Sequence, residues 1–222
     1  MVNDPYGKAD RMNEVNKEMV HIIGLTGGIG SGKSFIARGL SARGYAVYDT
    51  DREAKRLIHE DAAVQKALIA LFGPEVYSTD GTYQTQHVAR RVFEDKSLLQ
   101  QLNAIVHPAV RRDIEQWKKK ISTVHTAQAD RKNYQLSIVI ESAILFESGF
   151  DTLCDKVIVV TAPEELRLRR VIGRDKTDID KVRARMRAQL NDTELCRRAD
   201  LVVINDGTKT IEELCQYITQ HL

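Results

Sequence analysis

A glycine-rich segment near the start of the chain constrains the possible folds most strongly. Residues 27–34 match the pattern G-x-x-x-x-G-K-[ST], in which backbone N–H groups wrap around phosphate groups. A short apolar run, residues 20–25, precedes this segment, and an amphipathic stretch that includes Ile36 and Leu40 follows it. A buried parallel strand, a loop and a helix would follow one another in this way. The sequence therefore predicts a phosphate-binding loop, with an unliganded glycine-rich turn as the alternative.

The residue types in this segment suit a nucleotide and a divalent cation. Glycine lets the backbone approach an anion closely, and the start of a helix points free N–H groups toward it. Lys33 is expected to reach the β- and γ-phosphates, and the hydroxyl of Ser34 to bind Mg²⁺. Phe35 needs to supply only its N–H group. The predicted ATP contacts in the loop are Gly28, Gly30, Ser31, Gly32, Lys33, Ser34 and Phe35.

Further short, β-branched runs recur along the chain and predict a sheet. They are followed by polar or turn residues and separated by helical patterns, an alternation that favours a parallel sheet with helices on both faces. In such a sheet the functional loops leave from the carboxyl ends of the strands. We therefore predict an α/β fold, a P-loop NTPase core with a parallel five-stranded sheet. The expected strands after the first are residues 45–48, 136–140, 156–160 and 201–204.

More than eighty residues separate the second and third predicted strands, too many for one crossover. Their apolar periodicity is mostly helical, so we predict a helical insertion over the active edge that holds the second substrate. A turn is expected at residues 77–82, and residues 122–133 are predicted to be a loop or an exposed helix. The expected helices are residues 53–59, 62–72, 86–93, 97–106 and 108–121.

A basic stretch follows the fourth predicted strand, where Pro163 is expected to begin a helix. Residues 167–187 hold nine basic side chains against three acidic ones, although the whole chain has a net charge of only +2. One interpretation is a solvated helical face. The other is an arginine-rich lid that closes over polyphosphate.

Two aspartates after the second predicted strand are candidates for the chemistry. Phosphoryl transfer needs the acceptor hydroxyl to be oriented or deprotonated, and Asp51 is assigned this role, with Asp49 supporting the water shell of Mg²⁺. Alternatively, the pair only caps a helix that begins near Arg52. Glu141 ends the third strand, where many ATPases carry an aspartate that holds Mg²⁺ waters, so its match is incomplete. The sequence has no N-K-x-D segment for reading guanine, which favours ATP over GTP.

The composition of the chain indicates where the protein is located and what kinds of partner it has. The chain has 222 residues, and no apolar run approaches the length of a membrane span. Its three cysteines are far apart and fit small buried side chains in a reducing compartment. We expect a cytoplasmic protein with small-molecule substrates and no nucleic-acid or membrane partner, and the sequence does not predict an oligomeric state.

Several motifs together resemble the dephospho-coenzyme A kinase family from about residue 20 to the C-terminus. The phosphate loop alone would be generic, but the His-Pro pair at 107–108 and the Leu-Phe-Glu segment at 145–147 make the resemblance specific. The other matching segments are residues 48–51, 72–73, 80–81, 102–106, Arg170, 174–175, Gln189 and 199–207.

The resemblance implies transfer of the ATP γ-phosphoryl group to the ribose 3′-hydroxyl of dephospho-coenzyme A, with Mg²⁺ as cofactor. Asp51 would face that hydroxyl, together with His107 and Glu147 as acceptor contacts. Arg170 and Arg174 would be charge clamps of the lid, with Arg174 counted as catalytic beside Lys33 and Asp51, and Asn205 an adenine-side contact. The implied organisation is an N-terminal tail (1–19), a nucleotide-binding core (20–51, 135–163 and 191–222), an acceptor-binding insertion (52–134) and a lid (164–190).

The chain departs from the family pattern at four positions, and two other functions remain open. Thr50, Ala143, Phe35 and Thr85 stand where the family commonly has Ala, Pro, Thr and Arg. The Asp-Thr-Asp segment also resembles shikimate-type kinases, although their later Gly-Gly-Gly motif is missing. A non-catalytic nucleotide-binding regulator is the third possibility, and it would not need the carboxylate pair.

Overall fold

The computed structural model describes residues 20–128 and 136–222. The predicted tail, residues 1–19, and residues 129–133 of the predicted polar segment lie outside the described residues. Within the described ranges, no helix is both long enough and apolar enough to cross a membrane.

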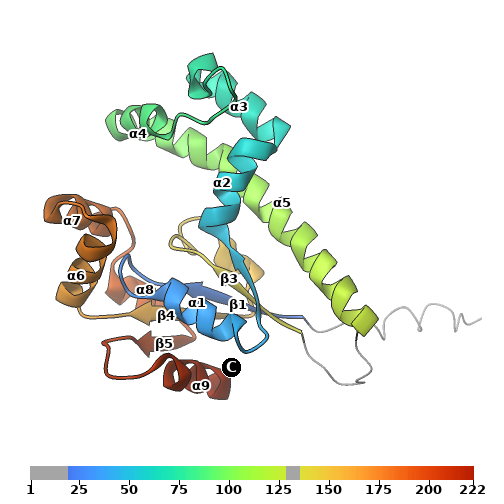
Figure 1. Ribbon diagram of the computed structural model, residues 1–222, viewed down its shortest axis with the longest axis vertical. Helices are drawn as coiled ribbons and strands as arrows, with labels where there is room; N and C mark the ends of the chain where they lie inside the picture. The colour runs from blue at the N-terminus through green and yellow to red at the C-terminus, as the bar shows by residue number, and fades with distance from the viewer. Residues whose placement is uncertain (1–19, 129–135) are drawn as a thin grey trace, which may run out of the picture.

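One parallel sheet forms the centre of the molecule, as predicted (Figure 1). The strand order is β2-β3-β1-β4-β5, so β1 lies between the strands that enter the sheet later. The register places Asp49 at the end of β2 opposite Glu141 at the end of β3, and Glu141 opposite Leu25 of β1. Polar residues of distant segments therefore meet at the carboxyl edge. The strands are β1 (His21–Thr26), β2 (Ala46–Asp49), β3 (Ser137–Glu141), β4 (Lys156–Thr161) and β5 (Leu201–Ile204).

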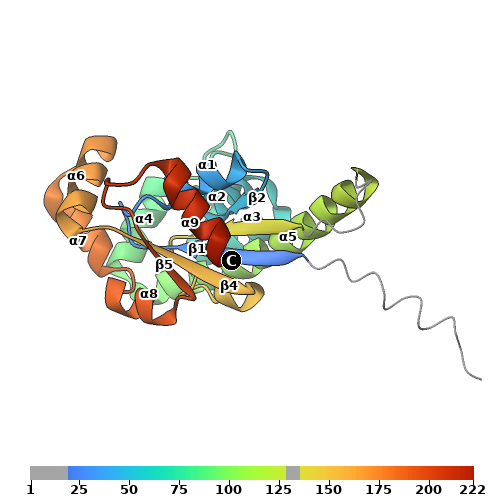
Figure 2. The ribbon, with the colours of Figure 1, turned by 90° about the horizontal axis from the view of Figure 1, so that it is seen from below.

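Alternating strand residues build the core on both faces of the sheet. On one face Ile23 and Val139 pack with α1 (Lys33–Ser41) and α9 (Ile211–His221). On the other face Ile22 and Ile138 belong to a cluster that includes α5 (Lys96–Gln128) and α8 (Asp192–Arg198). Figure 2 shows α1 and α9 on one side of the sheet and α8 on the other.

The predicted insertion is helical and extends away from the sheet (Figure 1). Asp61 separates its first two helices, because its carboxylate accepts hydrogen bonds from the N–H groups of Ala63 and Val64 at 2.8 and 3.1 Å and thereby caps the second. Gly73, with φ of 91°, ends that helix. The elements are α2 (Thr50–Glu60), α3 (Ala62–Phe72), the 3₁₀ helix η1 (Pro74–Val76), α4 (Thr85–Glu94) and α5 (Lys96–Gln128).

The prediction of two helices at residues 97–106 and 108–121 is wrong, because both belong to the single helix α5, with Pro108 inside it. Proline removes one helical hydrogen bond and usually kinks or ends a helix. Here the buried side chains Val106, Ala109 and Val110 pack into the same cluster on both sides of the proline. Burial of this continuous apolar face outweighs the local cost, so the helix continues.

Two short helices, α6 (Glu164–Asp175) and α7 (Ile179–Arg187), form the predicted lid region at one end of the sheet (Figure 1). Pro163 occupies the N-cap of α6, one position before the first turn in which it was expected. Leu168, Val171 and Val182 form a small core with Ile29 of the glycine-rich loop packed against it. The lid helices are thus in contact with the loop. The remaining 3₁₀ helix, η2 (Phe150–Leu153), follows β3.

Candidate active site

The glycine-rich loop joins β1 to α1 in a conformation that needs glycine. Gly27, Gly30 and Gly32 have φ values of 145°, 81° and 99°, which other residues rarely adopt. A side chain at Gly27 would place its Cβ 2.0 Å from the carbonyl oxygen of Val160. Gly32 caps α1 without a side-chain hydrogen bond, so the first N–H groups of the helix point out of its end. The loop is therefore shaped to bind an anion.

Lys33 lies across this loop. Its Nζ donates a hydrogen bond to the carbonyl oxygen of Gly27 at 2.8 Å. Burial lowers the pKa of Lys33, while the nearby carboxylates of Glu141 and Asp51 raise it. The ammonium group is thus partly desolvated beside two anions, and a phosphate in the loop would add further stabilising charge.

Ser34 and Glu141 form the oxygen-rich part of the site. The hydroxyl of Ser34 donates a hydrogen bond of 2.6 Å to Oε1 of Glu141, and burial raises the pKa of Glu141. Mg²⁺ is usually bound by protein oxygen ligands together with phosphate oxygens and water. The hydroxyl of Ser34 and the carboxylate of Glu141 supply two such protein oxygens beside the loop. The residues present therefore fit a magnesium ion, and Glu141 is placed for this role more directly than the sequence motif indicated.

The structure gives Asp49 and Asp51 different surroundings. Asp49 is the N-cap of α2, and its Oδ1 accepts a hydrogen bond from the N–H of Arg52 at 3.0 Å, so the capping alternative is correct for Asp49. Asp51 lies in the first turn of α2 and lines a pocket. Partial burial and the charge of Asp49 raise the pKa of Asp51, while Lys33 lowers it. Asp51 thus lies within electrostatic reach of the phosphate loop.

A mostly apolar pocket adjoins Asp51 and is formed between α2 and α5. Helix α2 supplies one wall, helix α5 supplies the facing wall, and the segment after β3 closes the end. Asp51 is the acidic residue in this lining, so a ligand in the pocket would meet a single carboxylate. The lining residues are Thr50, Asp51, Ala54, Ile58, Leu102, Asn103, Val106, His107, Val110, Ile144 and Phe150.

Of the two predicted acceptor contacts beyond Asp51, the structure places only one in this pocket. His107 lines it, with its ring 5.9 Å from that of Phe150 in an edge arrangement. Burial lowers the pKa of His107 and so favours the neutral imidazole. Glu147 is exposed outside the lining, and its Oε1 accepts a hydrogen bond from the N–H of Leu190 at 3.1 Å. The structure therefore does not bring Glu147 to Asp51.

A second cleft lies between the phosphate loop and the lid. Arg170 and Arg174 of α6 line it together with Lys33, Ser34 and Phe35. Arg174 is largely exposed and pairs with Asp175, with Nε and Oδ1 2.7 Å apart, and Arg185 pairs with the same carboxylate. The lid interpretation fits these two arginines, because both reach the cleft beside the loop.

Asn205 is buried against the loop. Its Nδ2 donates a hydrogen bond to the carbonyl oxygen of Ser31 at 2.8 Å. A Cβ at Gly32 would lie 2.1 Å from the same nitrogen, so the glycine makes room for this contact. The predicted nucleotide contact at Asn205 thus also holds the loop in shape.

Two side chains hold the loop without having been assigned that role. Arg167, predicted as one of the lid's basic residues, is buried: it donates to the carbonyl oxygen of Ile29 at 3.1 Å and pairs with Asp192. Gln189 accepts a hydrogen bond from the N–H of Ile29 at 2.9 Å and donates to the carbonyl oxygen of Ala143 at 3.3 Å. These contacts join segments far apart in sequence, so the sequence assigned neither residue to the loop: Gln189 appeared only in the family resemblance, and Arg167 only among the basic residues of the lid.

The parallel sheet, the glycine loop with Lys33 and Ser34 at its end, and the helical insertion and lid around it define this chain as a P-loop kinase. The family model described as Dephospho-CoA kinase matches residues 21–210. The chain therefore belongs to the dephospho-CoA kinase family, which confirms the resemblance seen in its motifs.

Individual relatives agree with this assignment. A dephospho-CoA kinase from Porphyromonas gingivalis is 40% identical over 82% of this chain and 85% of its own length. One from Bacteroides fragilis is 38% identical over 85% of this chain and 86% of its own length. The crystal structure of TT1252 from Thermus thermophilus superposes with a TM-score of 0.71 at 33% identity, covering 90% of this chain and 96% of that one. A Campylobacter jejuni dephospho-CoA kinase shares the fold, with a TM-score of 0.63 at 23% identity over 90% and 95% of the two chains.

Proposed function

We propose that this kinase transfers the γ-phosphoryl group of ATP to the ribose 3′-hydroxyl of dephospho-coenzyme A, giving coenzyme A and ADP in the last step of coenzyme A synthesis. The observation that carries the proposal is the position of Asp51. It lines the pocket between α2 and α5 and interacts electrostatically with Lys33 of the phosphate loop. An acceptor hydroxyl beside Asp51 would therefore face the end of a triphosphate bound in the loop.

The acceptor hydroxyl is activated by Asp51. Its oxygen forms the new bond to the γ-phosphorus as the bond between that phosphorus and the β–γ bridging oxygen breaks, and ADP leaves with the electron pair. The hydroxyl proton passes to Asp51, whose pKa is raised by partial burial and by Asp49. A raised pKa makes the carboxylate a better proton acceptor at neutral pH.

Charge on the transferred group is neutralised by cations that line the loop. Lys33 lies at the loop, and Arg170 and Arg174 line the cleft beside it. Ser31 contributes a buried hydroxyl that has no hydrogen-bond partner within residues 20–128 and 136–222, which supports a contact with a phosphate oxygen. Ser34 and Glu141 would hold Mg²⁺, with Asp49 near its water shell, and the bound ion would supply positive charge beside the phosphates.

The pocket supports recognition of the nucleoside part of the acceptor. Its walls are mainly aliphatic, and the half-buried neutral His107 offers one donor and one acceptor nitrogen. Glu147 is proposed to act indirectly, by holding the segment at Leu190. The magnesium requirement, a cytoplasmic location, and the lack of nucleic-acid and membrane partners stay predictions.

The function is tested by incubating the purified chain with Mg-ATP and each of two acceptors, dephospho-coenzyme A and shikimate. We expect phosphorylation of dephospho-coenzyme A only. Phosphorylation of shikimate alone would replace the proposed acceptor, and nucleotide binding without turnover on either acceptor would favour a regulator.

A further inference from the structure

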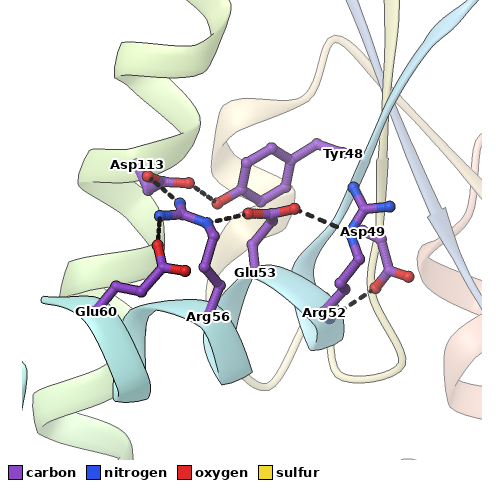
Figure 3. Close-up of polar contacts among 7 residues, drawn as sticks. All are labelled: Tyr48, Asp49, Arg52, Glu53, Arg56, Glu60 and Asp113. Atoms are coloured by element: carbon purple, nitrogen blue, oxygen red, sulfur yellow. Dashed lines mark hydrogen bonds and ion pairs between the residues drawn. The ribbon is translucent and has the colours of Figure 1, made fainter.

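A network of polar side chains connects β2, α2 and α5 immediately outside the acceptor pocket (Figure 3). The hydroxyl of Tyr48, a residue only 2% exposed, donates a hydrogen bond of 2.5 Å to Oδ2 of Asp113. The other carboxylate oxygen of Asp113 accepts a hydrogen bond from Nη2 of Arg56 at 2.7 Å. Asp113 of α5 therefore connects Tyr48, near the end of β2, with Arg56, in the middle of α2.

Arg56 gives the network a defined geometry. Its Nε contacts Oε2 of Glu53 at 2.6 Å and its Nη1 contacts Oε2 of Glu60 at 3.3 Å, so one guanidinium holds three carboxylates. The side chains of Glu53 and Asp113 are only 15% and 18% exposed. An isolated surface pair contributes little, but a partly desolvated network with a buried tyrosine hydroxyl loses much more when one partner is removed.

The network lies next to the reacting groups in both sequence and space. Tyr48 precedes Asp49 at the end of β2, and Arg56 lies about 1.4 turns after Asp51 on the same helix. Asp113 follows His107 and Val110 on α5, the helix that forms the opposite wall of the pocket. The ring of Trp117 packs edge-on against Tyr48 with centroids 5.3 Å apart, which adds an apolar contact to the same junction.

We infer that Asp113 is a positioning residue for the transfer. Together with Tyr48 and Arg56 it fixes α5 against the start of α2, so that Asp51 and the acceptor pocket keep one relative placement. This inference rests on the proposed function, in which Asp51 must meet a hydroxyl held by both walls. A displacement of about 1 Å at such a site lowers the rate by about 10²-fold, although none of the three residues lines the pocket.

The kinetic test uses Tyr48→Phe, Asp113→Ala and the double variant, with the concentrations of ATP and acceptor varied separately. Each single variant is expected to lower kcat about 10-fold to 100-fold while KM for Mg-ATP changes less than about twofold. Asp113→Asn retains an acceptor oxygen for one of the two donors and should recover part of the loss. The double variant should be no slower than the worse single variant, because both changes break one network.

Ser78→Ala is the matched control. The hydroxyl of Ser78 donates a hydrogen bond of 2.5 Å to Oδ1 of Asp80 in the turn between η1 and α4, and neither residue lines the pocket. This variant removes a comparable hydroxyl contact from the insertion and should keep kcat within about twofold of wild type. If Tyr48→Phe and Asp113→Ala behave like it at a temperature at which all variants are folded, the network is only structural and the inference is wrong.

Amide hydrogen exchange of the ligand-free chain separates this inference from the proposed acceptor. Tyr48→Phe and Asp113→Ala should speed exchange in residues 50–56 by about 10-fold or more relative to Ser78→Ala. Unchanged exchange there would overturn the positioning role whatever the acceptor is. If wild-type protein fails to phosphorylate dephospho-coenzyme A while exchange responds as expected, the proposed function fails and the coupling of α5 to α2 stands.

Discussion

The phosphate side and the acceptor side of this site are built in different ways. The phosphate loop is one continuous segment whose shape depends on glycine, and it is held from outside by Asn205, Gln189 and Arg167. The acceptor pocket has no such segment, because its walls come from α2 and α5 and depend on how two helices pack. In the proposed function, the first region would supply the charges that the reaction needs, and the second would set where the acceptor lies. Changes on the two sides should therefore have separable kinetic effects.

The largest effect is expected on the phosphate side. Lys33→Ala removes the ammonium group at the phosphate loop and should lower kcat/KM for ATP by about 10³-fold, since one donor aimed at developing charge contributes about 10²–10³-fold. Steady-state kinetics with varied Mg-ATP checks this. Lys66→Ala, at an exposed position on α3, is the control for loss of a lysine. Wild-type kcat/KM in Lys33→Ala would contradict the role given to the loop.

Asp51→Asn should affect the chemical step without affecting ATP binding. The amide cannot accept the proton, so kcat is expected to fall at least about 10²-fold while ATP binding, measured by calorimetry, stays near that of wild type. Asp49→Ala provides the contrast, because it removes the cap of α2 and should lower the free energy of unfolding by about 1 kcal/mol. Equal kcat values for wild type and Asp51→Asn would remove Asp51 from the chemistry.

A smaller effect is expected for Glu141→Gln, which keeps the size of the side chain but removes its charge beside Ser34. We expect the Mg²⁺ concentration for half-maximal activity to rise about 10-fold, since a carboxylate is the better ligand. Titration of activity with Mg²⁺ at fixed ATP measures this. Glu147→Gln, at an exposed position outside both clefts, should leave the titration unchanged, and a shift as large as that of Glu141→Gln would argue against a specific metal site.

The smallest effect concerns pH and the acceptor side alone. Burial lowers the pKa of His107 in the folded protein below its unfolded value of about 6.5. The folded state therefore favours the neutral ring, so stability from this group is complete above about pH 6.5 and is lost as pH falls toward the folded pKa. His107→Gln should reduce the loss of stability between pH 7 and pH 5, measured by urea unfolding. The same substitution at exposed His59 should not, and an equal change in both variants would refute the assignment to His107.

The sequence predicted the sheet more completely than the site. The β-branched runs locate every strand of the sheet to within about one residue, because buried parallel strands have few alternatives, and residues 62–72 were predicted with the observed bounds of α3. Local pattern was misleading at Pro108, where packing on both sides of the proline overrides its tendency to end a helix. The motif alone singles out Ser34, whereas the position of Glu141 beside it depends on a contact across 107 positions.

Contacts of this long-range kind explain what sequence reasoning missed. Asn205 reaches Ser31 across 174 positions, and Arg167 reaches Ile29 across 138 positions. Both meet the loop because β4, which precedes Arg167, lies beside β1, and β5, which precedes Asn205, lies beside β4 in the folded sheet. Likewise, the pairing of Tyr48 with Asp113 depends on the packing of α5 beside β2 and α2, and no local periodicity encodes it. The residues of the phosphate loop can be identified from a motif, but those that hold the site in shape cannot.

The central claim is tested most directly by locating the phosphate that the enzyme transfers. The protein is incubated with Mg-ATP labelled on the γ-phosphate and with dephospho-coenzyme A, in parallel with an analogue that lacks the ribose 3′-hydroxyl, and the products are analysed by phosphorus NMR. We expect one labelled phosphate on the 3′-oxygen, none on the analogue, and loss of the signal in Asp51→Asn. Label on another oxygen, or transfer that persists without the 3′-hydroxyl, would contradict it.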